Sequence, residues 1–295
     1  EAGGFANTYS TEYDGVDQYC KTDATYSELD GINNFAFSFW INPTNITNKM
    51  IFTIGNSQAD TRAQQFQCFI SADKLILYMT NMSVQGRTYA GVISLNQWQH
   101  VLITRDASRG IGDKIRIYVN GVDQEIESGG GGHPAHPDQN YDVPLQTTQY
   151  VLGYDGGNNG FCGYAADYLY SDGQSLAPTE FGETDSDTGI WIPKDVSGTT
   201  FGNSGYYLDF ADSSALGKDV GNSKGNFSHY GGAAIDQATD TPTNNFCTIN
   251  ALVDNNFSIW SLTEGGTRGP NTGENNASVG TFAVSSGKWY WEGVT

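Results

Sequence analysis

Two stretches of the sequence decide the fold class: Trp98-Gln-His-Val-Leu-Ile-Thr-Arg105 and Lys114-Ile-Arg-Ile-Tyr-Val-Asn-Gly-Val122. In the second stretch apolar residues alternate with polar or aromatic ones, and this period of two predicts a half-buried β-strand. The pair Asn120-Gly121 tolerates positive φ at both central positions of a turn, so we expect a tight hairpin there. The two stretches together predict antiparallel β-sheet.

The composition favours the same class. The 295 residues include 37 Gly and 17 Tyr, and 13% of the side chains are aromatic, which suits many short strands joined by turns. The best helical candidate, residues 175–183, amounts to one or two turns opened by a proline. We therefore expect an all-β protein.

Short runs bounded by Asn, Gly, Asp or Ser predict further strands. The run 35–43 carries large apolar side chains on both faces, as expected for a central strand buried on both sides. Several antiparallel strands bury their apolar faces best in a two-sheet jelly-roll sandwich. The other predicted strands are residues 13–20, 50–54, 65–70, 75–79, 150–154 and 161–170.

Five motifs follow one another along the first part of the chain. They are Tyr13-Asp-Gly-Val-Asp-Gln-Tyr19, Phe37-Ser-Phe-Trp-Ile-Asn-Pro43, Trp98-Gln-His-Val101, Ile117-Tyr-Val-Asn-Gly121 and Gly163-Tyr-Ala-Ala-Asp-Tyr-Leu-Tyr170. In this order they resemble the laminin-G-like branch of the concanavalin A-like lectin/glucanase jelly rolls. The resemblance implies such a jelly roll over residues 1–185. It implies no ligand, because this superfold hosts lectins, hydrolases, adhesion modules and spacers.

A second set of motifs lies further along the chain. Residues 171–183, 189–194, 206–210 and 241–250 resemble a module that follows the jelly roll in tail and fibre proteins of bacteriophages. Residues 280–292 resemble the opening strands of a SPRY domain. These resemblances imply a smaller β-rich module over 186–250 and the incomplete start of a second, SPRY-like β domain over 251–295.

The net charge excludes one class of partner. The chain has 14 Lys and Arg against 33 Asp and Glu, which gives −19, and the acidic residues are scattered. We expect no nucleic-acid binding, because neutralising phosphates requires clustered cations. We also expect no membrane insertion, because the sequence has no run of 18 apolar residues.

The four cysteines are interpreted as small buried hydrophobic residues. Disulfides are the alternative if the chain matures in an oxidising compartment. They are Cys20, Cys68, Cys162 and Cys247.

Residues that flank Gly- and Asn-rich turns are the candidates for carbohydrate binding, because their rings and polar groups would face a sugar. These candidates are Tyr154, Asp155, Asn158, Asn159 and Trp191. Tyr206 and Tyr207 flank similar turns and would also offer stacking faces to sugar rings. For these tyrosines, Tyr154 and Trp191, the alternative is packing at a module junction.

A metal is not required, and calcium is the cation that the oxygen-rich turns would take. Asp14, Asp17 and Asp155 are its candidate ligands. His133 and His136 are interpreted as part of a surface insertion and not as a zinc site.

The leading functional hypothesis is a noncatalytic structural or adhesion component of a phage virion: a tail fibre, an appendage or a capsid decoration. It would lie on the virion surface or outside the cell, form a homo-oligomer such as a trimer, contact other virion proteins and bind a host surface glycan. One alternative is a polysaccharide depolymerase, with acids from Asp123, Glu125 and Glu127 on one face of a strand. The other is a secreted cell-surface adhesion, filament or sheath protein.

Overall fold

The computed structural model describes residues 5–22, 34–54, 66–79, 84–88, 91–110, 113–128, 149–153, 159–221 and 225–243. The chain divides into two compact units, Glu1–Asn244 and Asn245–Thr295, and all the described residues belong to the first. The predicted SPRY-like start therefore lies outside the described residues.

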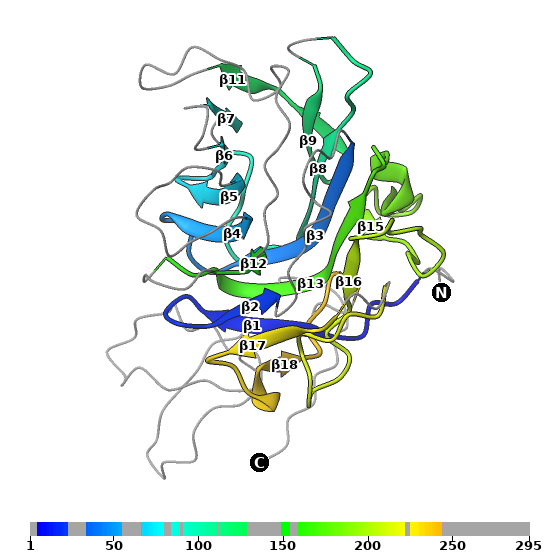
Figure 1. The fold of residues 1–295 in the computed structure, drawn as a ribbon. Coiled ribbons are helices and arrows are strands. Elements are labelled where there is room, and N and C mark those ends of the chain that lie inside the picture. The colour runs from blue at the N-terminus through cyan, green and yellow to red at the C-terminus, as the bar shows by residue number, and fades with distance from the viewer. Residues whose placement is uncertain are drawn as a thin grey trace, which may run out of the picture. The chain divides into compact units, whose positions relative to one another are not determined.

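The first unit is a sandwich of two antiparallel sheets, as predicted (Figure 1). The first sheet has the order β10-β9-β8-β3-β13-β1-β18, and β16 also pairs with β13. Its strands are β1 (Ser10–Asp14), β3 (Phe35–Pro43), β8 (Gln99–Arg105), β9 (Ile115–Val119), β10 (Val122–Gln124), β13 (Cys162–Asp172), β16 (Tyr206–Leu208) and β18 (Gln237–Ala238).

The second sheet has the order β11-β7-β6-β5-β4-β12-β2-β17. Its strands are β2 (Tyr19–Thr22), β4 (Lys49–Ile54), β5 (Phe66–Ser71), β6 (Lys74–Met79), β7 (Val84–Thr88), β11 (Ile126–Ser128), β12 (Gln149–Val151) and β17 (Phe227–Tyr230). A separate hairpin joins β14 (Gly182–Thr184) to β15 (Trp191–Pro193), and the short helices are single 3-10 turns, η3 (Pro178–Glu180) and η4 (Ala234–Asp236).

The hairpin that the sequence predicts is present. Val119 of β9 lies opposite Val122 of β10, and the two residues between them, Asn120 and Gly121, have φ angles of 49° and 76°. Both values lie in the left-handed region, which the strand twist of a two-residue hairpin requires. The prediction from the Asn-Gly pair is confirmed.

The core lies between the two sheets and is rich in stacked aromatic rings. Strand β3 is buried along its whole length, as predicted for a central strand. The Phe37 ring lies 4.6 Å from Phe52 of the second sheet and 4.4 Å from Tyr170 of β13, measured between ring centroids. The contact with Phe52 joins the two sheets, and the contact with Tyr170 lies within the first sheet. Large buried rings of this kind supply much of the apolar area in such a core.

A smaller apolar cluster covers the opposite, outer face of the first sheet. Along β8, Val101 and Ile103 point into the main core, whereas Leu102 belongs to the outer-face cluster. This alternation follows from the period of two in a strand. Phe181, Val196 and Phe201 from the following segment pack against that face, and Ala36, Leu169 and Tyr207 complete the cluster.

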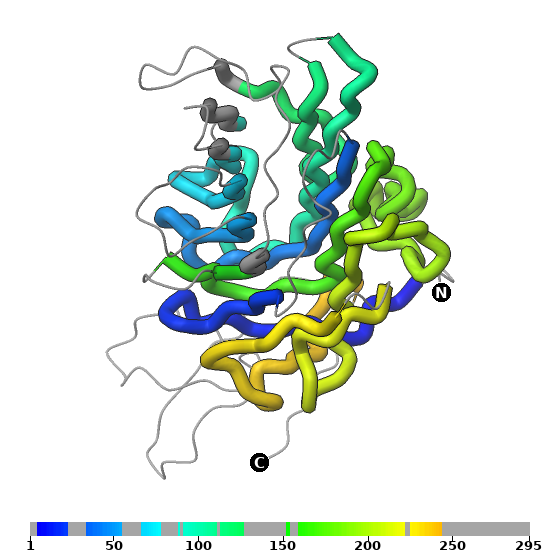
Figure 2. Tube along the Cα trace, in the orientation of Figure 1, coloured from blue at the N-terminus to red at the C-terminus, as the bar shows by residue number. Residues whose placement is uncertain are grey.

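Strands from residues 186–243 complete both sheets. In the first sheet β16 pairs with β13 and β18 pairs with β1; in the second sheet β17 pairs with β2. Figure 2 shows the blue N-terminal segment beside the yellow and gold tube of these later residues. The expected domain boundary after residue 185 therefore does not coincide with the boundary between compact units, which follows Asn244.

The acidic segment after the hairpin differs from the prediction. Asp123 lies in β10 of the first sheet, whereas Glu127 lies in β11 of the second sheet, and Glu125 connects them. The chain crosses between the sheets here, so the three acids do not share one face of a strand. Asp123 pairs instead with Arg116 of the neighbouring strand.

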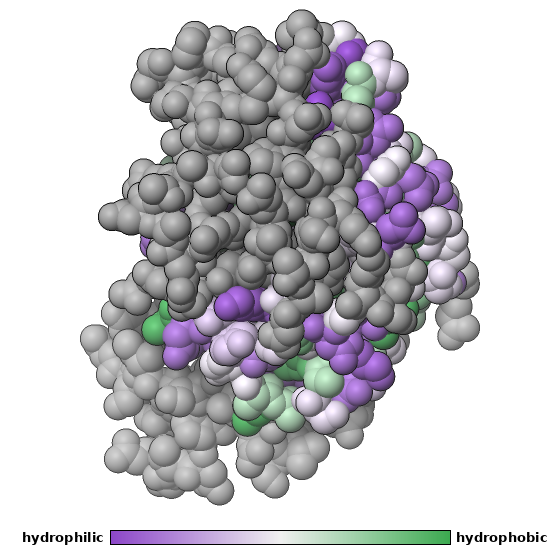
Figure 3. All heavy atoms as spheres, in the orientation of Figure 1, coloured by the Kyte–Doolittle hydropathy of each residue, from purple (hydrophilic) through white to green (hydrophobic). Residues whose placement is uncertain are grey.

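The surface has the polarity expected from the charge of −19. In the orientation of Figure 3, hydrophilic colours predominate among the described residues, with a few hydrophobic residues near the bottom. In the described part of the chain, no helix is long and apolar enough to cross a membrane.

Two of the cysteines are buried small residues, as predicted. Cys20 and Cys68 are fully buried free thiols, and burial raises the pKa of Cys20 to about 12 and that of Cys68 further. Cys162 is a free thiol that is partly exposed, and Cys247 lies outside the described residues.

Candidate functional site

The site begins with a fork in the first sheet. Along one edge of β13, β1 pairs with the residues up to Ala165 and β16 pairs with the residues from Tyr168 onward. A bulge interrupts the pairing with β3 between Ala166 and Leu169. Asp167 therefore lies where two edge strands diverge, and its φ of 44° is in the left-handed region. Bulges re-aim side chains in this way, and Asp tolerates the left-handed region better than most residues.

Two donors hold the Asp167 carboxylate, which is only 6% exposed. The Tyr207 hydroxyl donates to Oδ1 at 2.6 Å, and the Asn7 side-chain amide donates to Oδ2. Burial raises the pKa of Asp167 to about 6, although both hydrogen bonds act in the opposite direction. The carboxylates of Asp209 and Asp195 raise it further. The three carboxylates thus interact electrostatically around one point.

Hydroxyl groups of Thr241 and Thr243 hold the N-terminal residues 5–9 at this fork. Thr241 and Thr243 both donate to the backbone carbonyl of Asn7, at 2.9 and 3.0 Å. The Tyr9 amide donates to the Asn7 side-chain oxygen at 3.2 Å, and the Ser10 hydroxyl donates to the Asp240 carbonyl at 2.6 Å. Asn7 is therefore oriented toward Asp167 by its own neighbours.

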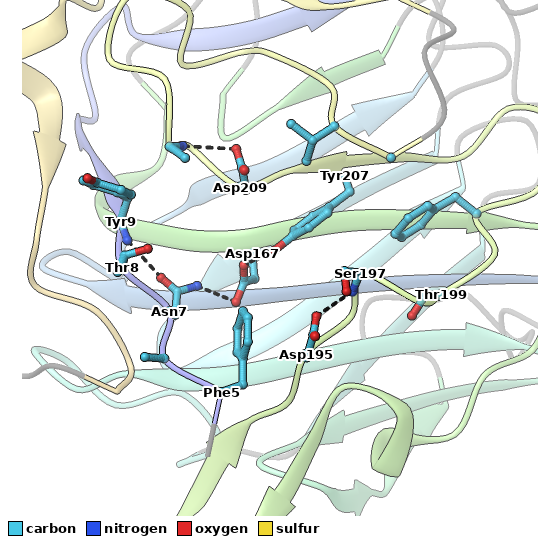
Figure 4. A pocket seen from close by; sticks show the side chains of 15 residues that line it. Phe5, Asn7, Thr8, Tyr9, Asp167, Asp195, Ser197, Thr199, Tyr207 and Asp209 are labelled. Atoms are coloured by element: carbon cyan, nitrogen blue, oxygen red, sulfur yellow. Dashed lines mark hydrogen bonds between the residues drawn. The ribbon is translucent and has the colours of Figure 1, made fainter. Parts of the chain in front are cut away.

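A cavity of about 400 Å³, which we call the fork cavity, lies over Asp167 (Figure 4). Its walls are formed by the N-terminal residues 5–9, the bulge of β13, residues 195–201 and the residues around β16. Carboxylates, hydroxyls, one amide and aromatic rings alternate around it. Its lining residues are Phe5, Ala6, Asn7, Thr8, Tyr9, Asp167, Asp195, Ser197, Thr199, Phe201, Tyr207, Asp209, Ala211, Val220 and Gly221.

Local turns present two of the carboxylates at the rim. Oδ1 of Asp195 accepts from the Ser197 amide at 2.9 Å, and Oδ1 of Asp209 accepts from the Ala211 amide at 3.1 Å. Hydrogen bonds from Ser197 lower the pKa of Asp195, so this group is ionised at neutral pH. The Ser197 side chain also hydrogen-bonds to Asp195, whereas among the described residues no group donates to Oδ2 of Asp209. A carboxylate oxygen accepts more than one hydrogen bond, so both groups can still accept from a ligand.

The aromatic side of the cavity comes from the outer-face cluster. The rings of Phe201 and Tyr207 stack with centroids 5.9 Å apart at an angle of 24°. Both rings are largely buried, and Tyr207 also holds Asp167, so the wall is anchored at its base. The cavity thus combines a rigid apolar wall with polar acceptors, the usual composition of a small-molecule site.

The carbohydrate-binding candidates from the sequence are only partly within the described residues. Tyr154, Asp155 and Asn158 lie outside them. Asn159 is exposed, and its backbone carbonyl accepts from Met50 of the second sheet at 2.7 Å.

Trp191 packs against the first sheet and is half-buried. A Cβ placed on Gly121 or on Gly182 would come within 2.5 Å of its indole ring. This is the packing alternative given for Trp191. The structure therefore places Trp191 and Asn159 against different sheets, and it assigns neither of them to the fork cavity.

The calcium candidates can be followed at two positions. Asp14 and Asp17 are both exposed in the turn after β1, where Oδ1 of Asp14 accepts from the Val16 amide at 2.8 Å. Calcium takes about six to eight oxygen ligands, more than two aspartates supply. Within the described ranges, no three His, Cys, Asp or Glu side chains gather as a metal site would require. Asp155 lies outside these ranges, so the calcium site stays a prediction.

His100 is packed and hydrogen-bonded within strand β8. It is fully buried, and its Nε2 lies 2.8 Å from the Ser38 hydroxyl. Burial lowers its pKa to about 3, so the ring is neutral at physiological pH. His133 and His136 lie outside the described residues.

Among the lining residues of the fork cavity, Tyr207 is the one that the sequence indicates as a stacking face for a sugar. Asp167 stands within the motif Gly163-Tyr-Ala-Ala-Asp-Tyr-Leu-Tyr170, where a charged residue interrupts an otherwise apolar strand. That interruption is the signal for Asp167. Asn7 carries no comparable signal, and its contact with Asp167 spans 160 residues of sequence, whereas the Tyr207 contact spans 40.

Several solved structures have partial similarity to this chain. Among solved structures, domains LG4-5 of the mouse laminin alpha1 chain are 14% identical, with a TM-score of 0.39, over 58% of this chain and 42% of theirs. The CBM40 of the Ruminococcus gnavus IT-sialidase is 9% identical, with a TM-score of 0.41, over 59% and 96%. The botulinum neurotoxin serotype D binding domain is 14% identical, with a TM-score of 0.39, over 59% and 41%.

The chain thus spans less than half of the laminin and toxin structures, and similarities of this size carry no information on a ligand. No curated protein sequence is significantly similar. A family profile, by contrast, matches residues 14–167, which is more than half of the chain. These residues contain strands of both sheets, including β3 and β8 of the first sheet and β4 and β5 of the second. The chain therefore belongs to the concanavalin A-like lectin/glucanase superfamily.

Proposed function

We propose that this chain is a noncatalytic adhesion module that binds a surface glycan in the fork cavity and is displayed on a phage virion. It would form part of a tail fibre, an appendage or a capsid decoration, as a homo-oligomer in contact with other virion proteins. The fork cavity is the observation that carries the binding role.

The size and lining of the cavity support a sugar ligand. Its volume of about 400 Å³ is within the range of small-molecule sites, about 300 to 1,000 Å³. Asp195 and Asp209 offer carboxylate oxygens to sugar hydroxyls, and Ser197 and Thr199 offer hydroxyls. Phe201 and Tyr207 add apolar area for the carbon skeleton. Contacts of this kind suit a polar and hydrated ligand.

The arrangement of Asp167 favours binding over hydrolysis. Hydrolysis of a glycosidic bond usually needs one carboxyl that gives up a proton and a second across the cleft. Both oxygens of Asp167 already accept hydrogen bonds, from Tyr207 and Asn7. Asp167 is therefore used to hold the walls together, and we infer a site without catalysis.

The virion assignment rests on the resemblance of the later motifs to phage tail and fibre modules. Those motifs contribute directly to the cavity: Tyr207 and Asp209 lie within 206–210, and Asp195 follows 189–194. The proposed binding site is therefore shared by the jelly roll and the segment that carries the phage-like motifs.

The binding role is tested with the full chain on an array of defined oligosaccharides. Ala211→Trp fills the cavity from its rim, and Ala177→Trp places the same ring at an exposed position outside it. We expect wild-type and Ala177→Trp protein to bind the same glycans and Ala211→Trp to lose at least about tenfold in affinity. Binding that survives Ala211→Trp, or no binding by the wild type, contradicts the proposal.

Two further measurements test the other parts. Bound polysaccharide incubated with the protein should release no new reducing ends; release would make the chain a depolymerase. Mass spectrometry and cryo-microscopy of the native particle should find the chain in symmetric copies on a capsid or tail. A location on a cell surface or in a free filament would overturn the virion assignment.

A further inference from the structure

We propose that the fork cavity selects uncharged glycans and rejects glycans that present a carboxylate, sulfate or phosphate. This inference rests on the proposed function, and it names the class of ligand that the cavity accepts. Its basis is the uncompensated negative charge of the cavity lining.

The lining has three acidic residues, Asp167, Asp195 and Asp209, and none of its fifteen residues is Lys, Arg or His. They come from β13, from the segment after β15 and from the residue after β16, so they surround the space from different elements (Figure 4). A ligand that enters the cavity meets carboxylates on several sides and no cation.

The lysines nearest in sequence to the rim are engaged elsewhere. Lys194, beside Asp195, donates from Nζ to the Thr179 carbonyl at 3.1 Å. Lys218, which precedes the lining residues 220 and 221, pairs with Asp212 at 3.4 Å. Neither contact brings the ammonium group into the cavity, whose lining includes no lysine.

The negative charges of Asp195 and Asp209 at the rim act on the residues at the base of the cavity. Asp195 and Asp209 raise the pKa of both Asp167 and Tyr207, the two residues that form its base. An anionic group in this space would face the same repulsion. Charges interact more strongly in a partly buried site than in bulk water, so the repulsion acts on any bound anion.

Uncharged sugars match the hydrogen-bonding groups that remain. The Oδ2 atoms of Asp195 and Asp209 are acceptors, and a sugar hydroxyl is the complementary donor. A carboxylate or sulfate group on the ligand offers only acceptors, so it cannot form a hydrogen bond with either aspartate. Selection thus follows from hydrogen bonding as well as from charge.

The experiment uses matched glycan pairs that differ only by a terminal sialic acid or a sulfate. The wild-type chain should bind the uncharged member at least about tenfold more tightly than the charged one. The discrimination should shrink when NaCl is raised from about 0.05 M to about 0.5 M, because salt screens charges.

Variants assign the discrimination to the rim. In the double variant Asp195→Asn/Asp209→Asn, which keeps the oxygen that caps each turn, the two glycans should bind within about threefold of each other. Asp187→Asn removes a charge at an exposed position outside the cavity, and it should keep the wild-type ratio.

The outcomes separate this inference from the proposed function. If the wild type binds no glycan, or if Ala211→Trp leaves binding unchanged, the proposed function fails. If binding is blocked by Ala211→Trp but charged glycans bind as tightly as uncharged ones, only the selectivity is overturned. A ratio that Asp195→Asn/Asp209→Asn does not change also overturns it.

Discussion

The buried carboxyl group of Asp167 should make the stability of this protein depend on pH in a predictable direction. Its ordinary pKa is 3.8, and burial in the folded protein raises it to about 6. Between these values the folded protein holds a proton that the unfolded chain releases. The stabilisation from this proton is complete below about pH 4 and is lost as the pH rises through about 6.

The size of the effect follows from the two pKa values. The difference between 3.8 and about 6, at about 1.4 kcal/mol per pKa unit, corresponds to about 3 kcal/mol in the free energy of unfolding. Asp167→Asn removes this titration and retains an oxygen that can accept from Tyr207. The free energy of unfolding of the variant, relative to that of the wild type, should therefore rise by about 3 kcal/mol between pH 4 and pH 7.5.

Urea unfolding of the full chain, followed by tryptophan fluorescence across this pH range, measures the difference. Comparing the variant with the wild type cancels the other titrating groups, including Glu12, whose pKa burial also raises. Asp187→Asn, at an exposed position, serves as the matched control and should stay parallel to the wild type. Parallel curves for Asp167→Asn would refute the reasoning, because the buried carboxyl would then titrate as in the unfolded chain.

Three further predictions concern the core and the hairpin. Gly121→Ala should destabilise the fold by about 2 kcal/mol or more, measured by urea unfolding, because the new Cβ meets the Trp191 ring and φ is +76°. Phe37→Ala should cost about 3 to 5 kcal/mol by thermal and urea unfolding, since it empties space between two stacked rings. Cys20 and Cys68 should resist thiol reagents at pH 8 until the chain is denatured, because burial raises both pKa values; labelling of either in the native state would contradict this.

Local patterns predicted the sandwich because they are properties of short segments. The alternation in 115–119 requires a strand, and the Asn120-Gly121 pair requires a tight turn wherever the segment lies. The large apolar side chains on both faces of β3 favour burial on both sides. The structure confirms each of these predictions, because the hydrophobic period, the turn residues and the burial pattern all favour the same local structure.

Other expectations depended on how distant segments pair, and the structure changed them. Asp123 and Glu127 are four residues apart, yet they lie in different sheets because the chain crosses between layers at Glu125. Residues 186–250 are predicted as a smaller β-rich module, and strands from this range pair with strands of both sheets of the sandwich. Composition does not tell whether a short strand joins an existing sheet or belongs to a separate module, because that depends on the strands with which it forms hydrogen bonds.

The sequence by itself determined the all-β class, the hairpin, the central strand and the excess of negative charge, since each is encoded in local pattern or in composition. Only the tertiary structure decided the fork cavity. Asn7, Asp167 and Tyr207 meet because two edge strands diverge along β13, and the Asn7 amide and Tyr207 hydroxyl lie 160 and 40 residues from the carboxylate they hold. Contacts at such separations depend on sheet order and register, which no single segment specifies.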